Sequence, residues 1–280
     1  MTHIVAGLLG DTVQRDYARK LKLLNAFAQP ELRAVIAELE LPAGSRVLDA
    51  GCGTGEAVGW LQEAVGEGGV TIGMDLASAH VRSARDIAPA AMIVQGDMLH
   101  PCFAGGTFDL IWTVNAINHL REPVAGIRTL SDLLRPGGRI AIGQSSLLPD
   151  MYFAWDARLE KIVNDAVRAY YRDRYGRSER EFAGVRGLVG WLRRADLRGV
   201  SVHTRMIERT YPLSPADKDY LLEAIFRGTW GERLRGYMDP EDFQELMRLC
   251  DPADERYALR RADFHFLQSF TIAVAMRGST

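Results

Sequence analysis

A regular alternation of short apolar runs and helical segments between residues 45 and 142 constrains the fold of this chain most. The segments between these runs carry apolar residues at helical spacing. Strands that alternate with helices at this spacing are typical of βαβ units, which form a parallel sheet with helices on both faces. The runs that we interpret as strands cover residues 45–50, 69–75, 91–94, 108–114 and 139–142.

The flanking segments predict further elements around this sheet. Before it, helical spacing over residues 11–29 and 31–39 indicates two helices that Pro30 separates. After it, residues 144–181 and 212–262 read as helical insertions. Between and after these insertions the pattern indicates two last strands, over 200–211 and 264–276, and the second of them carries apolar residues on one face at period two.

We therefore expect a single α/β domain over residues 1–280 with a Rossmann-like, mixed sheet of seven strands and helices on both faces. Residues 1–40 would form an N-terminal helical cover, 41–143 the binding core, and 144–181 and 212–262 a helical lid. In open α/β sheets the ligand crevice lies beyond the carboxyl ends of the strands, where such insertions become a lid or a substrate pocket.

Composition excludes several classes of protein. With 47% hydrophobic and 25% charged residues, the chain has the composition of an ordinary globular protein. Its net charge of −2 provides no general attraction to nucleic acid or to an anionic membrane. Its three cysteines fit neither a disulfide framework nor a zinc pattern, so we expect no metal. No signal peptide or membrane span is evident, and we expect a cytoplasmic protein.

The most informative segment is a glycine-rich loop at residues 47–55, VLDAGCGTG. An acid, Asp49, ends the strand, and three glycines at alternate positions lead into a helix; such glycines let a ligand approach the main chain closely. The spacing is not the dinucleotide pattern G-x-G-x-x-G, because Glu56 occupies the place of its third glycine. An acid at this helix N-terminus is a poor neighbour for a pyrophosphate. The loop suits an adenosine ligand without phosphate.

The segment D-x-G-x-G-x-G resembles motif I of the class I S-adenosylmethionine-dependent methyltransferases, in particular their UbiE-like, small-molecule members. The resemblance continues in order along the chain, over about residues 10–143 and the last strand pair. The further matching segments are Asp75 at the end of TIGMD, the residues Gly96-Asp97-Met98, the run Phe108–Ile111 followed by Asn115, and the turn Leu134–Gly138.

This resemblance implies S-adenosyl-L-methionine as the cofactor and a set of residues around it. Asp75 would accept hydrogen bonds from the ribose hydroxyls, Asp97 would bind the adenine amino group, and Asn115 would lie near the methionine end of the cofactor. The whole set is Tyr17, Asp49, Gly51, Cys52, Gly53, Gly55, Asp75, Leu76, Asp97, Met98 and Asn115.

Simpler interpretations of some of these residues remain open. Asp97 could be only a turn residue, because Gly-Asp is a common turn dipeptide. Tyr17, on the N-terminal helix, either closes over the cofactor or packs on the sheet edge. Cys52 is most simply a small loop side chain, and nothing indicates a reactive thiol.

His119 is our candidate catalytic base, because it follows the fourth strand at the edge that should face the transferable methyl group. A hydroxyl nucleophile needs a base to remove its proton, whereas the sulfonium leaving group needs no protonation. The alternative for His119 is a structural role where the next helix begins. We interpret His3, His80 and His100 as surface residues, and His203 and His265 as packing or surface residues of the last strands.

The resemblance and the insertions predict an enzyme that methylates oxygen or nitrogen of a small molecule, in secondary or cofactor metabolism. Aromatic residues in the insertions favour an aromatic or lipophilic acceptor. Between Arg168 and Arg198, nine arginines against four acids give a local charge of +5, either a solvated face or an attraction for an anionic substrate. The alternatives are a methyltransferase that acts on tRNA or protein, and a non-methylating member of the fold such as a cyclase. The oligomeric state stays open.

Overall fold

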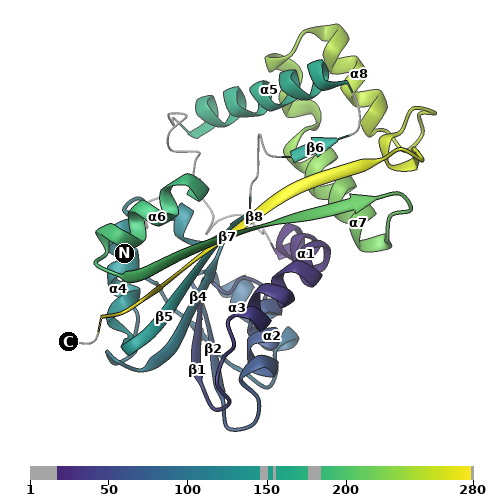
Figure 1. Cartoon of the computed structure of the whole chain (residues 1–280). Helices are drawn as coiled ribbons and strands as arrows, with labels where there is room; N and C mark the ends of the chain where they lie inside the picture. The colour runs from purple at the N-terminus through teal and green to yellow at the C-terminus, as the bar shows by residue number, and fades with distance from the viewer. Residues whose placement is uncertain (1–17, 146–150, 154–155, 176–183, 279–280) are drawn as a thin grey trace.

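The computed structural model describes residues 18–145, 151–153, 156–175 and 184–278 (Figure 1). Its sheet has the strand order β3-β2-β1-β4-β5-β8, and β7 pairs with the outer side of β8. The first five strands are parallel, and β8 is antiparallel to both of its long neighbours. These strands are β1 (Arg46–Ala50), β2 (Val70–Asp75), β3 (Met92–Gln95), β4 (Phe108–Val114), β5 (Leu134–Ser145), β7 (Arg198–Thr210) and β8 (His265–Met276).

A short additional strand, β6 (Met151–Phe153), extends this sheet. It pairs with residues 266–268 of β8, whereas β5 pairs with residues 270–276 of the same strand. β6 therefore continues the line of β5 along β8. The predicted seven-stranded mixed sheet is confirmed, with β6 as an eighth strand segment.

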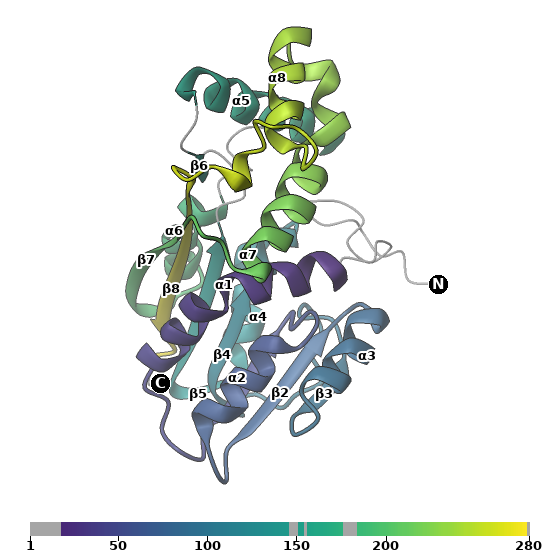
Figure 2. The same ribbon diagram turned by 90° about the vertical axis from the view of Figure 1, so that its right-hand side faces the viewer.

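Helices cover both faces of the sheet, as predicted (Figures 1 and 2). On one face, buried side chains of α1 and α2 pack with Leu110 and Trp112 of β4. On the other face, α4 and α6 pack with Leu48 and Ile111. The helices are α1 (Ala18–Glu38), α2 (Glu56–Val65), α3 (Ser78–Ile87), α4 (Pro123–Asp132) and α6 (Gly184–Arg194).

The remaining helical segments form a layer above the sheet in Figure 1, reached by the extended upper halves of β7 and β8. Their buried side chains, such as Phe226 and Leu246, belong to the same core as those of α1, so this lid is packed onto the cover helix. The lid segments are α5 (Ala157–Tyr175), α7 (Pro215–Asp219), the π-helix η2 (Tyr220–Thr229), the 3₁₀-helix η3 (Gly231–Tyr237), α8 (Pro240–Cys250) and the 3₁₀-turn η4 (Ala258–Arg260). No helix in the described ranges is both long and apolar enough to cross a bilayer.

Two sequence expectations about these elements were wrong. Pro30 does not separate two helices but lies inside α1, where Phe27 and Leu32 on either side of it are buried and stabilise the continuous helix. The segment after Gly143 does not begin as a helix, because β5 runs on to Ser145 and β6 precedes the helix α5.

Candidate functional site

The glycine-rich loop joins β1 to α2 and is held against β2. The main-chain N–H groups of Gly51 and Cys52 both donate to the carbonyl oxygen of Met74, at 2.7 and 3.0 Å. Gly51 and Gly55 have φ angles of 82° and 95°, in the left-handed region that disfavours residues with a Cβ. The loop therefore follows the carboxyl end of β1 in a conformation that its glycines permit.

Close packing gives the same glycines a second role. A Cβ on Gly51 would lie 2.5 Å from the Cβ of Ala116, which follows β4. A Cβ on Gly55 would lie 2.7 Å from the Cα of Ala84 in α3. Hence the absent side chains let the neighbouring segments approach the loop. At Gly53 a Cβ would lie 3.0 Å from Cδ1 of Leu21, so the cover helix α1 contacts the loop directly.

Three carboxylates surround this loop. Asp49, at the end of β1, is 2% exposed. Burial raises its pKa well above the usual value, and the negative charges of Asp75 and Glu56 raise it further. Glu56 accepts hydrogen bonds from the side chains of Asn25 and Thr54, at 2.7 and 2.6 Å. This acidic environment favours a cationic ligand and disfavours a phosphate.

Asp75 ends β2 and connects the glycine loop to the beginning of α3. Its Oδ2 accepts the N–H of Gly53 at 2.9 Å, and its Oδ1 accepts the N–H of Ala77 at 2.9 Å. The Nδ1 atom of His80 lies 3.2 Å from the same Oδ1. The expectation that His80 is a surface residue was wrong: it is 8% exposed, because the first turn of α3 directs it back onto Asp75.

The residues expected around adenine follow β2 and β3. Leu76, next to Asp75, is 38% exposed. Oδ1 of Asp97 accepts the N–H of Leu99 at 2.9 Å, and its Oδ2 lies 3.2 Å from Nδ1 of the exposed His100. These contacts stabilise the turn that contains Asp97. That bonding is compatible with the simple turn interpretation and with a ligand contact. The end of Met98 lies 3.3 Å from the position of a Cβ on Gly51, beside the glycine loop.

Asn115 determines how the chain turns after β4. It has a φ of 54°, and its side chain bridges to β5: Nδ2 donates to the hydroxyl of Ser145 at 3.1 Å, and Oδ1 accepts the N–H of Ser145 at 2.8 Å. The residue thereby joins the carboxyl ends of two neighbouring strands. The turn brings Ala116 against the glycine loop and begins the 3₁₀-turn η1 (Ile117–His119).

Two polar atoms of η1, Oδ1 of Asn118 and Nδ1 of His119, are buried without a hydrogen-bond partner among the described residues. A buried polar atom without a partner costs about 1–3 kcal/mol, so such atoms in consecutive residues indicate a place for a ligand. Burial lowers the pKa of His119 to about 4, although the main chain of Asn115 and the charge of Asp75 oppose the shift. His119 is therefore a neutral imidazole at pH 7. Asn118 was not among the expected site residues, because no sequence motif marks it.

The remaining expectations concern Tyr17 and Cys52. Tyr17 lies outside the described residues. Cys52 is buried, and its burial, together with the negative charges of Asp49 and Asp75, raises the pKa of its thiol. A thiol with a raised pKa is not activated as a nucleophile, in agreement with the expectation of a small loop side chain.

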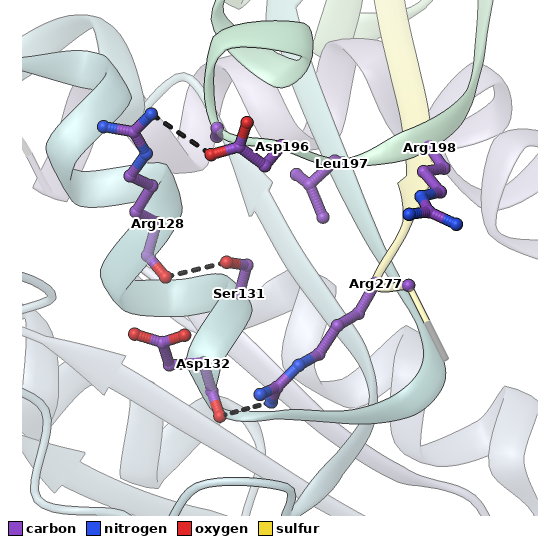
Figure 3. Close-up of a pocket in the computed structure, with 9 residues that line it drawn as sticks. Arg128, Ser131, Asp132, Asp196, Leu197, Arg198 and Arg277 are labelled. Carbon is purple, nitrogen blue, oxygen red and sulfur yellow. Dashed lines mark hydrogen bonds and ion pairs between the residues drawn. The ribbon is translucent and has the colours of Figure 1, made fainter. Parts of the chain in front are cut away.

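A separate pocket of about 390 Å³ lies at the other end of the sheet from the glycine loop, beside the last residues of α4 and β8 (Figure 3). Its arginines stabilise helix ends: Arg128 donates to the carbonyl of Arg194 and pairs with Asp196, and Arg277 donates to the carbonyl of Asp132. Arginine side chains that bond the last carbonyls of helices are a common stabilising feature. We therefore assign this pocket a structural role.

Among the known proteins that this chain resembles in sequence are methyltransferases. Residues 47–138 match the methyltransferase domain family. The ubiquinone biosynthesis O-methyltransferase of Xanthomonas axonopodis pv. citri is 29% identical over 216 residues, which cover 73% of this chain and 85% of that protein. The first curated methyltransferases that it matches are 31% identical, but the matches span only 42% and 39% of their length.

These matches support a class I S-adenosylmethionine-dependent methyltransferase. Solved structures of this fold include the YcgJ protein of Bacillus subtilis, with a TM-score of 0.56 and 15% identity over 90% of this chain and all of that one. The [4+2]-cyclase SpnF has a TM-score of 0.50 and 18% identity over 99% of this chain and 88% of that one. At these identities the likeness shows the methyltransferase fold alone. S-adenosylmethionine is the cofactor of the family.

Proposed function

We propose that this protein transfers a methyl group from S-adenosyl-L-methionine to oxygen or nitrogen of a small molecule, in secondary or cofactor metabolism. The observation that carries the proposal is the arrangement after β4: the free buried atoms of Asn118 and His119 follow the turn that places Ala116 against the glycine loop. An acceptor site thus adjoins a loop of cofactor-binding geometry.

The residues of the loop fit this cofactor. Gly51 and Gly55 keep the main chain open to close approach, and among the described residues no basic side chain bonds the loop where a phosphate would need one. The negative charges of Asp75 and Glu56, which also raise the pKa of the buried Asp49, provide negative potential for a sulfonium cation. Asp75 would accept from the ribose, whereas Asp97, Met98 and Leu76 would surround the adenine. Asn115 would lie at the methionine end.

The cofactor, when bound, supplies an activated methyl group for an in-line displacement. The task of this chain is then alignment, exclusion of water and removal of the acceptor's proton. Nδ1 of the neutral His119 can accept that proton from a hydroxyl, because its low pKa leaves the ring unprotonated. Oδ1 of Asn118 can accept a second hydrogen bond from the acceptor and orient it.

A small acceptor is supported by the relatives and by charge. The Xanthomonas relative is named for ubiquinone biosynthesis, which favours an aromatic or lipophilic acceptor. Of the aromatic residues that the insertions contribute, Phe226 and Trp230 are 1% and 2% exposed and stack on each other in the lid core, so they support the packing of the lid rather than an open pocket. The side chains of Tyr152, Phe153 and Trp155 lie outside those described.

Nucleic acid is a poorer candidate. The net charge is −2, and within the arginine-rich segment Arg168 and Arg172 lie 3.6 and 3.9 Å from the carboxylates of Asp165 and Asp173. A tRNA enzyme must neutralise several phosphates. A cytoplasmic location remains part of the proposal, supported by three cysteines that form no disulfide.

The deciding experiment incubates the protein with methyl-labelled S-adenosylmethionine and an extract of the host, followed by separation into small-molecule, RNA and protein fractions. We expect label only in the small-molecule fraction, together with release of S-adenosylhomocysteine. Label in RNA or protein alone would establish the macromolecular alternative. No transfer at all, despite measurable cofactor binding, would favour a non-methylating reaction such as the cyclisation that SpnF's name records.

A further inference from the structure

His80 is placed to act on the cofactor site through Asp75. It lies in the first turn of α3, five residues after Asp75, and the two side chains are 10% and 13% exposed. Nδ1 of His80 is 3.2 Å from Oδ1 of Asp75. Because a carboxylate only accepts hydrogen bonds, Nδ1 must carry the proton of this contact.

The bonds of Asp75 show what this contact does. Oδ1 receives two donors, the N–H of Ala77 and the ring of His80, whereas Oδ2 receives one, the N–H of Gly53. A carboxylate offers about four acceptor positions. The described residues occupy three of them, two on Oδ1 and one on Oδ2, so the remaining position lies on Oδ2, the oxygen that contacts the glycine loop.

His80 is the side chain among these donors, and the other two belong to the main chain. The main-chain donors come from both sides of Asp75, from the loop before α2 and from the beginning of α3. Without the His80 ring, Oδ1 would keep only the N–H of Ala77 as a donor, and the carboxylate of Asp75 could rotate more freely about its Cβ–Cγ bond. Loss of a preorganised acceptor weakens binding without removing any group that touches the ligand.

We propose that His80 is a positioning residue for the ribose of the cofactor: by donating to Oδ1 of Asp75 it directs Oδ2 toward the ribose hydroxyls. This inference rests on the proposed function, because it assigns a partner to the same cofactor site. His80 would not contact the cofactor itself but would act on it through Asp75.

The test compares His80→Leu, which removes the donor, with His80→Asn, whose amide can donate from nearly the same place. Binding of S-adenosylhomocysteine and of its 2′,3′-dideoxy analogue is measured by calorimetry. We expect His80→Leu to weaken S-adenosylhomocysteine about tenfold, the range for a charge-assisted hydrogen bond, and His80→Asn to restore most of the loss. The dideoxy analogue should bind His80→Leu and the wild type within about twofold, because it has no hydroxyl to present to Oδ2.

His265→Leu is the matched control, since it removes an exposed histidine that lies 2.7 Å from the carboxylate of Glu208 in the last strand pair. It should leave both ligands unaffected. An equal loss for both ligands in His80→Leu, or no loss for either, would overturn the inference and make His80 a packing residue. If the wild type binds neither ligand, the proposed function itself fails.

Should His80→Leu not fold, side-chain ¹⁵N–¹H spectra of the wild type give an independent measurement. We expect a hydrogen on Nδ1 of His80, with a signal that shifts when S-adenosylhomocysteine binds but not when the dideoxy analogue does. An Nδ1 without hydrogen, or the same shift with both ligands, would contradict the proposal.

Discussion

Arg209 of β7 lies over the ring of Phe27 in α1, with its guanidinium carbon 4.7 Å from the ring centre, and Nη2 donates to the Phe27 carbonyl at 2.6 Å. The same guanidinium binds both oxygens of Glu31 at 2.7 and 3.0 Å, and Nε donates to Asp217 at 2.8 Å. One side chain thus joins the edge of the sheet, the cover helix and α7 of the lid. It also bonds α1 three residues before Pro30, where the proline weakens the helix.

Replacing Arg209 by Met should destabilise the protein by about 3 kcal/mol, because Glu31 and Asp217 would stay largely buried without their cation. Urea unfolding measures the loss. The control is Arg261→Ala, which breaks an exposed pair with Asp263 and should cost less than about 1 kcal/mol. Equal stability of the two variants would show that the bonds of Arg209 to Glu31 and Asp217 do not stabilise the protein.

Gly55→Ala should strongly impair the protein. The change forces an alanine into a φ of 95° and its Cβ to 2.7 Å from the backbone of Ala84. Strain and overpacking together should cost at least about 2 kcal/mol and lower the melting temperature by about 4 °C or more. Gly59→Ala, in α2 with open space around its Cβ position, should be neutral or stabilising. A similar melting temperature for both would show that the loop can move.

Asp75→Ala should weaken binding of S-adenosylhomocysteine by about 1.5–3 kcal/mol, roughly ten- to a hundredfold, because it removes a charged acceptor. Calorimetric titration gives the affinity. Asp86→Ala, an exposed carboxylate on α3, is the control and should bind normally. Unchanged affinity in Asp75→Ala would exclude the ribose contact.

His119→Gln should lower kcat by about 10²–10⁴ for a hydroxyl acceptor, with cofactor affinity nearly intact. His203→Gln, exposed on β7, should retain full activity. A loss in His119→Gln of less than about threefold would assign His119 to structure and leave catalysis to alignment alone.

The pH profile offers a separate check on His119. Since burial lowers the pKa of His119 from 6.5 to about 4, the ring loses its proton at a lower pH than an ordinary histidine. The active, neutral form should therefore persist as the pH falls below 6.5, and kcat/KM should decline only near pH 4. A decline centred near pH 6.5 in the wild type, absent in His119→Gln, would contradict a buried neutral base.

The core of this fold could be predicted from local pattern, because βαβ units repeat one physical arrangement. Asp49, Gly51 and Asp75 all lie at the carboxyl ends of strands for that reason. The glycines of the loop follow from the left-handed main-chain conformation that the turn after β1 requires. Elements whose form depends on tertiary contacts were not predictable. The helix α1 passes through Pro30 because burial on both sides offsets the local cost.

The same distinction between local sequence pattern and tertiary contacts applies to the residues of the site. The positions of Asp75 and Asn115 result from strands that end where the apolar pattern ends. The burial of His80 depends on how α3 lies on the sheet, and nothing in the polar-looking segment around Ser78 indicated it. Asn118 is a candidate only because its Oδ1 is enclosed, a property that arises when distant segments pack around it; a Cβ on Gly184, for example, would lie 3.5 Å from the Cβ of Asn118.

The position of β8 between β5 and β7 determines the order in which the chain can assemble. β7 has no strand partner among the described residues other than β8, which follows it by more than fifty residues of lid. During synthesis the five parallel strands can pair as they emerge, while the lid and β7 must wait for β8. The candidate cofactor loop can therefore fold before the lid does. Translation that stalls before β8 would leave a parallel sheet with an open edge at β5, the form of this protein most exposed to aggregation.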